Sequence, residues 1–111
     1  MNSNKLVQSV RSQIDAVKGY LVAEGFSDVE DSPGQKPALE AAHVDNVHTF
    51  LVTWEGRRPI LRLSYAWLRE RDANAVAPWR SERNIAEQLK PCIEMRIVGD
   101  YPIGGPIMLE N

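Results

Sequence analysis

The sequence predicts an α+β domain, namely a three- to four-stranded, mainly antiparallel sheet packed by an N-terminal helix and a central helical pair. Three observations lead to this class. Apolar residues recur at helical spacing near the N-terminus, two alternating segments typical of strands follow, and helix signals lie between those two segments. The chain has 111 residues, of which 43% are hydrophobic and 25% charged. We therefore expect a single domain over residues 1–111 with a core of its own.

The N-terminal helix is predicted over Asn4–Glu24. Its apolar positions lie three or four residues apart and so share one face: Leu6, Val10, Ile14, Val17 and Leu21. Gly25 suits the position just after the helix, because glycine adopts a left-handed conformation at low cost. Phe26 is then expected to fold back on the last helical turn.

The next segments are predicted to be a loop and then the best strand of the chain. Ser27–Pro37 is rich in acidic and turn-forming residues and is expected to be a surface loop, with a short edge strand around Val29 as the alternative. Ala38–His43 is ambiguous and leans towards strand. Val47–Trp54 alternates β-branched and aromatic residues with apolar groups on both faces, which predicts a central strand.

A hairpin and a helix start follow this strand. Glu55–Arg58 is predicted to form the hairpin connection, and Pro59–Leu63 to return as the partner strand. Ser64 offers its hydroxyl as the N-cap of a helix that begins at Tyr65. This first helix of the central pair is expected to end near Asp72-Ala73-Asn74.

The last third of the chain is predicted to hold one more helix and one or two strands. The helix runs from about Trp79 to Leu89 and ends at Pro91. Residues 92–97 follow as a half-buried strand whose inward positions are predicted to be Ile93, Met95 and Ile97. Residues 99–105 are expected to be a turn or loop. Residues 106–109 are expected to form a short last strand or an apolar tail that docks on a neighbouring molecule.

Charge is unevenly distributed along the chain, whose formal net charge is −2. Residues 1–56 hold 4 basic and 8 acidic residues, whereas residues 57–96 hold 9 basic and 5 acidic ones. Such polarity favours self-complementary association if the sequence halves are also spatial halves.

Arginines and indoles gather in residues 57–83, which is the composition of a nucleic-acid surface. The candidate binding surface comprises Trp54, Arg57, Arg58, Arg62, Tyr65, Trp67, Trp79, Arg80 and Arg83. Acidic residues are interleaved with these arginines, and Arg69-Glu70-Arg71-Asp72 has the pattern of a solvated, self-compensating helix face. The alternative is therefore an ordinary charged surface with no binding role.

Few residues offer catalytic or metal-binding chemistry. His43 and His48 lie five residues apart around Asp45, but no third histidine or cysteine is near them, so ordinary polar residues beside a turn are the preferred interpretation. Cys92 is the single cysteine and is expected to be a buried, inert thiol. We find no catalytic, cofactor or metal motif, and we expect no cofactor, no metal and a binding protein rather than an enzyme.

Three function classes remain open. The first is a small non-catalytic accessory or regulatory protein that acts by protein–protein binding as a homo-oligomer, most simply a dimer. An open sheet edge, the apolar C-terminal tail and the polarised charge favour this class. The alternative is a nucleic-acid-binding module that uses residues 57–83. The third is a small-ligand-binding protein with an aromatic pocket between sheet and helices, lined by Trp54, Tyr65 and Trp67.

The sequence also predicts where the protein is found. No run of apolar residues is long enough to cross a membrane, so no membrane partner is expected. Residues 1–4 are polar rather than the start of an apolar leader, and no intrachain disulfide is possible with one cysteine. A cytoplasmic location is therefore expected.

Overall fold

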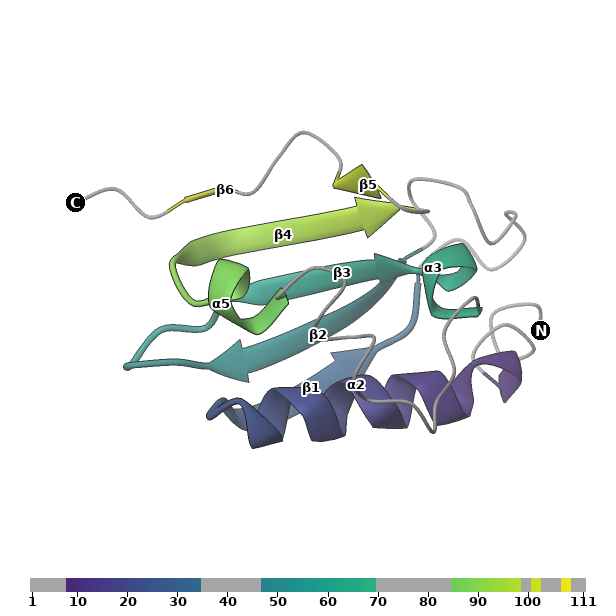
Figure 1. Ribbon diagram of the computed structural model, residues 1–111, viewed down its shortest axis with the longest axis horizontal. Helices are drawn as coiled ribbons and strands as arrows, with labels where there is room; N and C mark the ends of the chain where they lie inside the picture. Colours follow the sequence, from purple (N-terminus) through teal and green to yellow (C-terminus); the bar gives the residue numbers. More distant parts are fainter. Residues whose placement is uncertain (1–7, 35–46, 70–84, 99–100, 103–106, 109–111) are drawn as a thin grey trace.

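A computed structural model describes residues 8–34, 47–69, 85–98, 101–102 and 107–108 (Figure 1). Three helices and four principal strands follow one another along the chain, and two short strands complete the sheet. The elements are α2 (Arg11–Ala23), β1 (Ser27–Ser32), β2 (Val47–Thr53), β3 (Ile60–Ser64), α3 (Tyr65–Arg69), α5 (Ile85–Leu89), β4 (Cys92–Val98), β5 (Tyr101–Pro102) and β6 (Ile107–Met108).

The sheet has the spatial order β1-β2-β3-β4 and is mostly antiparallel, which confirms the predicted α+β class. β1 pairs with β2, and β2 with β3, in antiparallel fashion, whereas β3 and β4 are parallel. Both β5 and β6 pair antiparallel with β4. A parallel pair needs a crossover connection, and α3 and α5 lie in the connection between β3 and β4.

The described helices cover one face of the sheet, and the core lies between them and that face (Figure 1). The predicted helical stripe is confirmed over the described residues: Val10, Ile14, Val17 and Leu21 are all at most 1% exposed. The backbone N–H of Ala86 donates to Tyr20 Oη at 3.0 Å, which ties α5 to α2. The sheet contributes alternate residues to this core, among them Phe50, Leu61 and Met95, which are cross-strand neighbours.

Helix α2 ends in a Schellman motif, which confirms the prediction made from Gly25. Gly25 has a φ of 106°, which a side chain would disfavour. The Phe26 N–H donates to the Leu21 carbonyl at 3.1 Å and the Gly25 N–H to the Val22 carbonyl at 3.1 Å. Phe26 thereby folds back into the core, where it is 3% exposed.

The prediction of a surface loop over Ser27–Pro37 was wrong for its first half, because Ser27–Ser32 is the edge strand β1. Its alternative, an edge strand around Val29, was right. An edge strand exposes one edge and one face to water, so acidic and serine residues are tolerated there. Asp28 has a φ of 50°, and the register with β2 shifts between Ser27 and Glu30. Bulges of this kind are common at sheet edges.

The hairpin and the helix start that follow β2 are confirmed. Glu55 and Gly56 have φ values of 50° and 80°, as a type I′ turn requires. Trp54 and Arg57 exchange backbone hydrogen bonds of 2.9 and 3.0 Å across this turn. Ser64 caps α3, since its Oγ accepts the Trp67 N–H at 3.1 Å. The central position of β2 between β1 and β3 is also confirmed.

Strand β4 corrects one inward position. Met95 and Ile97 are buried as predicted, but Ile93 is 45% exposed and Cys92 takes the buried place at the start of the strand. The pairing with β6 is irregular between Cys92 and Glu94, which breaks the two-residue alternation there. Ile107–Met108 pairs with β4 of its own chain, so the alternative of a short last strand is the one confirmed.

Several predictions fall outside the described residues. They concern the helix start at Asn4, the segment Ala38–His43, the helix end near Asp72-Ala73-Asn74 and the helix start near Trp79.

Candidate functional site

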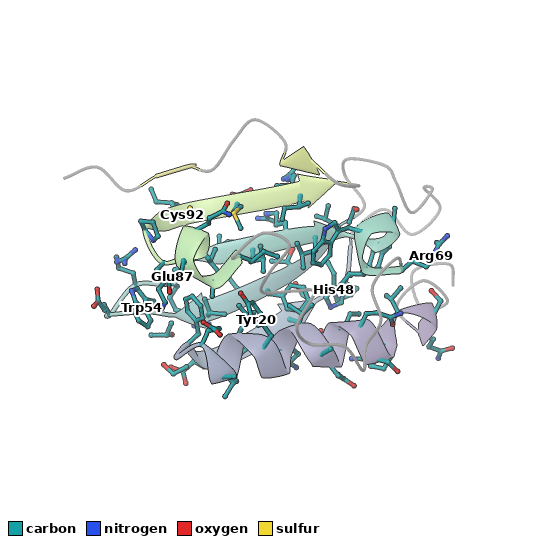
Figure 2. The ribbon with its side chains drawn as sticks, in the orientation of Figure 1. Tyr20, His48, Trp54, Arg69, Glu87 and Cys92 are labelled. Atoms are coloured by element: carbon teal, nitrogen blue, oxygen red, sulfur yellow. The ribbon has the colours of Figure 1, made fainter. Side chains whose placement is uncertain are left out.

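Two side-chain clusters lie at opposite ends of β2, around His48 near its start and around Trp54 just past its end (Figure 2). The His48 cluster is polar and buried. The Trp54 cluster is aromatic and partly exposed. The His48 cluster draws residues from two helices and two strands, and the Trp54 cluster from the turns that follow α2, β2 and α5. Each therefore marks a place where the fold joins distant parts of the chain.

The polar cluster is a chain of hydrogen bonds that we call the relay, made of Lys18, Asp31, His48 and Tyr65. Lys18 Nζ donates to Asp31 Oδ1 at 2.7 Å. The other carboxylate oxygen, Oδ2, lies 2.6 Å from His48 Nε2. His48 Nδ1 lies 2.9 Å from Tyr65 Oη. The Gly34 backbone N–H donates to the same Oη at 2.9 Å and closes the chain. The relay therefore joins α2, β1, β2 and α3.

One arrangement of protons satisfies every contact in the relay. A carboxylate only accepts, so the His48 Nε2 carries a proton and donates to Asp31. Tyr65 Oη already accepts from Gly34, so its own hydroxyl proton is free to donate to an unprotonated His48 Nδ1. The imidazole is then neutral, between a carboxylate on one side and a phenol on the other. A second proton, on Nδ1, would donate to Tyr65 Oη and leave the hydroxyl proton without an acceptor in the relay.

The electrostatics of the relay favour the same state. Burial lowers the pKa of His48, and Arg11 and Lys18 add to this effect, although the Asp31 carboxylate opposes it. Burial also raises the pKa of Tyr65, so the phenol keeps its proton. Partial burial tends to raise the pKa of Asp31, but the hydrogen bonds from Lys18 and His48 and the charge of Lys18 outweigh this effect and lower it. The relay thus holds one ionised carboxylate and a neutral imidazole.

The relay has the residue types of an acid–base site but not the access that catalysis needs. His48 and Tyr65 are each 1% exposed, so neither ring meets solvent. Both His48 ring nitrogens are engaged in hydrogen bonds. Within the part of the chain that the structure describes, no group of three or more His, Cys, Asp or Glu side chains is placed to hold a metal ion. The arrangement holds elements together and restricts the protonation of one histidine.

The aromatic cluster closes the other end of the sheet. The ring centroids of Trp54 and Phe26 are 5.4 Å apart, and the Lys90 Nζ lies 4.5 Å from the centroid of the Trp54 ring. Arg57 Nη2 donates to the Lys90 carbonyl at 2.8 Å, just past the C-terminus of α5. A guanidinium at this place satisfies a helix carbonyl and complements the helix dipole. Arg57 is therefore engaged in holding α5 to the hairpin.

The other described arginines of the candidate surface are paired with acidic residues. Arg62 Nε lies 3.1 Å from Glu94 Oε2, and its Nη1 donates to Thr49 Oγ1 at 3.1 Å. Arg58 Nη2 lies 3.4 Å from Glu30 Oε2. The interleaving of charges in the sequence is thus repeated in space, between residues that are distant along the chain.

The aromatic residues of the candidate surface do not come together. Tyr65 and Trp67 are 1% and 0% exposed and belong to the core. Trp54 lies at the far end of β2 from the His48–Tyr65 contact (Figure 2). These three side chains therefore do not line one common pocket. The remaining predicted residues lie outside the described ones: Trp79, Arg80 and Arg83.

The face of the sheet turned away from the helices, here called the outer face, carries two rows of cross-strand neighbours. One row has aliphatic residues at its centre and glutamates at both ends: Glu30, Leu51, Ile60 and Glu94. The second row is polar: Ser32, Thr49, Arg62 and Arg96. Leu51 and Ile60 are partly exposed. No described helix covers this face (Figure 1).

Cys92 is 1% exposed, as the sequence predicted for a buried thiol. Its Sγ lies 2.8 Å from the Gln88 carbonyl of α5, and burial raises the pKa of the thiol. A thiol with a raised pKa forms little of the reactive thiolate. The residue packs α5 against β4.

Sequence reasoning missed the relay and the outer face. It took His48 for an ordinary polar residue beside a turn, but one signal was present: His48 shares the alternation of Phe50 and Val52, which both point into the core. An imidazole at an inward position needs polar partners. Those partners, Asp31 and Tyr65, each lie 17 residues away in the chain, and nothing local to His48 identifies them.

Comparison of the chain with protein-family models, with curated proteins and with solved structures found no match. None of the described helices is long and apolar enough to cross a membrane.

Proposed function

We propose that the protein is a non-catalytic accessory module that acts by binding protein, and that its partner on the outer face is a second copy of itself. The observation that carries this proposal is the pair Leu51 and Ile60 at the centre of that face, with charged residues around it. An apolar centre inside a polar rim is the usual composition of a protein interface.

Charge complementarity favours a second copy as the occupant. On the β3–β4 side, Arg62 and Arg96 share a single glutamate, Glu94, at 3.1 and 3.7 Å. On the β1 side, Asp28 and Glu30 lie beside a single arginine, Arg58, whose Nη2 is 3.5 Å from the Asp28 carbonyl oxygen. A two-fold axis parallel to the strands sets the acidic side of one copy over the basic side of the other.

The other routes to a dimer have less support. Ile107–Met108 of the tail is paired with β4 of its own chain. Edge-to-edge pairing through β1 would bring the like charges of Asp28, Glu30 and Asp31 in two copies together, which is unfavourable. On the outer face the two-fold axis sets Glu30 of one copy over Glu94 of the other, but Arg62 and Arg96 offset the charge of Glu94.

The pairing of the arginines weighs against the alternative of nucleic-acid binding. Arg57 holds the carbonyl of Lys90, and Arg58 and Arg62 each contact a glutamate. An arginine whose charge is compensated by a glutamate, as in Arg58 and Arg62, attracts phosphate less strongly, and release of that glutamate would offset part of the gain.

Sedimentation equilibrium at micromolar concentrations tests the proposal, with a mass near twice the 12.5 kDa of the chain as the expected result. Leu51→Lys should yield a monomer that still folds, because the new ammonium lies beside Glu30. Val22→Lys is the matched control, since Val22 is an exposed aliphatic residue on α2 (59% exposed) and its replacement should leave the dimer intact.

Two outcomes would overturn the proposal. One is a mass of 12.5 kDa at all concentrations for the unaltered chain. The other is a Leu51→Lys variant as dimeric as the unaltered chain. A gel shift with a short RNA or DNA duplex at low and high salt tests the nucleic-acid alternative, because phosphate contacts weaken steeply with salt.

A further inference from the structure

Strand β1 has the weakest apolar attachment of the four principal strands. None of its six residues is buried. Only Val29 and Asp31, which point towards the helices, are partly buried. The strand also carries a register shift between Ser27 and Glu30. Segments with few buried apolar contacts open at lower free energy than the rest of a fold. The attachment of β1 therefore depends on its ladder with β2 and on the side-chain contacts of Asp31.

The contacts of Asp31 lead directly to the one buried histidine of the described chain. Its two carboxylate oxygens are held by Lys18 Nζ at 2.7 Å and His48 Nε2 at 2.6 Å. His48 is fixed in turn by Tyr65, whose hydroxyl also accepts the Gly34 N–H just after β1. Both the end of β1 and the residues that follow it are thus joined to the same imidazole.

We propose that the relay is an acid-sensitive latch on β1: a second proton on His48 loosens this strand while the rest of the sheet stays formed. The donor and acceptor pattern of the relay requires an unprotonated Nδ1 opposite the Tyr65 hydroxyl. Protonation turns Nδ1 into a donor, so the hydroxyl proton loses its acceptor in a buried place. The strand that opens is the one with the least apolar burial.

Among the described residues, the charged and titratable groups around His48 come from three elements. Lys18 and Arg11 on α2 repel an imidazolium, Asp31 on β1 attracts it, and Tyr65 on α3 competes as a donor. The neighbours on β2 and β3, Phe50 and Leu63, are apolar and offer no compensation. Because burial lowers the pKa of His48 below its usual 6.5, the open state takes up the proton more readily than the closed one. The attachment of β1 is therefore complete at neutral pH and is weakened as the pH falls below about 6.5.

Backbone hydrogen exchange at pH 7 and pH 5, corrected for the intrinsic exchange rate, tests the latch. The amides of β1 should lose protection relative to those of β3 and β4, by up to about tenfold per pH unit, since one proton is taken up. Equal protection of β1 at both pH values would overturn the proposal. A loss shared equally by β1, β3 and β4 would also overturn it, because the opening would then be global.

Three variants separate the latch from a structural role of the same residues. Lys18→Met should weaken the pH dependence of β1 opening, because removing a positive charge near the imidazole raises the pKa of His48 in the closed state towards that of the open state. Arg58→Met removes the exposed contact with Glu30 and should leave that pH dependence unchanged. His48→Gln keeps a donor for Asp31 but does not titrate, so its β1 protection should be independent of pH in this range.

The outcomes for these variants are decisive without further assumptions. A pH dependence that persists in His48→Gln would refute the latch. If that variant does not fold, an unchanged pH dependence of β1 opening in Lys18→Met would refute it instead. The oligomeric state is not involved, so the latch stands or falls separately from the proposed dimer.

Discussion

The two ends of β2 are closed in opposite ways. At the Trp54 end, two tilted aromatic rings are in contact, a lysine lies over an indole and an arginine bonds to the carbonyl just past a helix. At the His48 end, four polar side chains are buried or half-buried in one chain of hydrogen bonds. Apolar closure tolerates small shifts and does not depend on pH, whereas a buried polar chain works only when every donor meets an acceptor. From this difference we expect the stability of the fold to depend on pH at the His48 end and not at the Trp54 end.

The largest effect is expected at the aromatic end. Phe26→Ala removes a ring that is 3% exposed and packs on Trp54, so it should destabilise the protein by about 3–5 kcal/mol. Urea unfolding measures this loss, and it should be the same at pH 7.5 and pH 5.5 because neither ring titrates. A loss that changes with pH in this range would break the contrast between the two ends.

An intermediate effect is expected at the polar end. Tyr65→Phe removes only one oxygen, yet it leaves His48 Nδ1 and the Gly34 N–H without the partner they share. The expected loss at pH 7 is about 1–3 kcal/mol, the cost of unsatisfied buried polar groups. A neutral or stabilising substitution, measured by the same urea titration, would show that the hydroxyl is dispensable.

A smaller effect is expected at the turn that supports the aromatic end. Gly25→Ala places a methyl group at a φ of 106° and 3.3 Å from Trp54 Cζ3. The expected loss is about 1–2 kcal/mol, mostly from the backbone conformation. Gly19→Ala within α2 is the control, since nothing lies within 4 Å of its added methyl group, and it should be neutral or stabilising. Thermal unfolding of the pair measures the difference, and similar melting temperatures would contradict it.

The sequence was informative where the signals are local. Gly25 marked the end of α2, Ser64 marked the start of α3, and Gly56 marked the hairpin, each through the conformation or hydrogen bond that its residue type supplies. The stripe around Ile14 located the helical side of the core in the same way. These signals act over a few residues and can be read without a partner.

The sequence was less informative where a residue depends on distant partners. Ser27–Ser32 has the composition of a loop and becomes a strand because β2 offers an edge. The burial of His48 depends on Lys18 and Asp31, which only the fold brings near. Ile93 fits an alternating pattern that an irregular register interrupts. Long-range pairing decides each of these cases, and periodicity does not encode it.

The protonation of His48 at neutral pH is the direct test of this account. Long-range nitrogen–proton NMR correlations of the imidazole ring at pH 7 distinguish its two neutral tautomers from the imidazolium. The relay predicts a neutral ring with its proton on Nε2 and an unprotonated Nδ1 that accepts from Tyr65. A proton on Nδ1 at pH 7, in either the other tautomer or the imidazolium, would contradict the relay and the latch built on it.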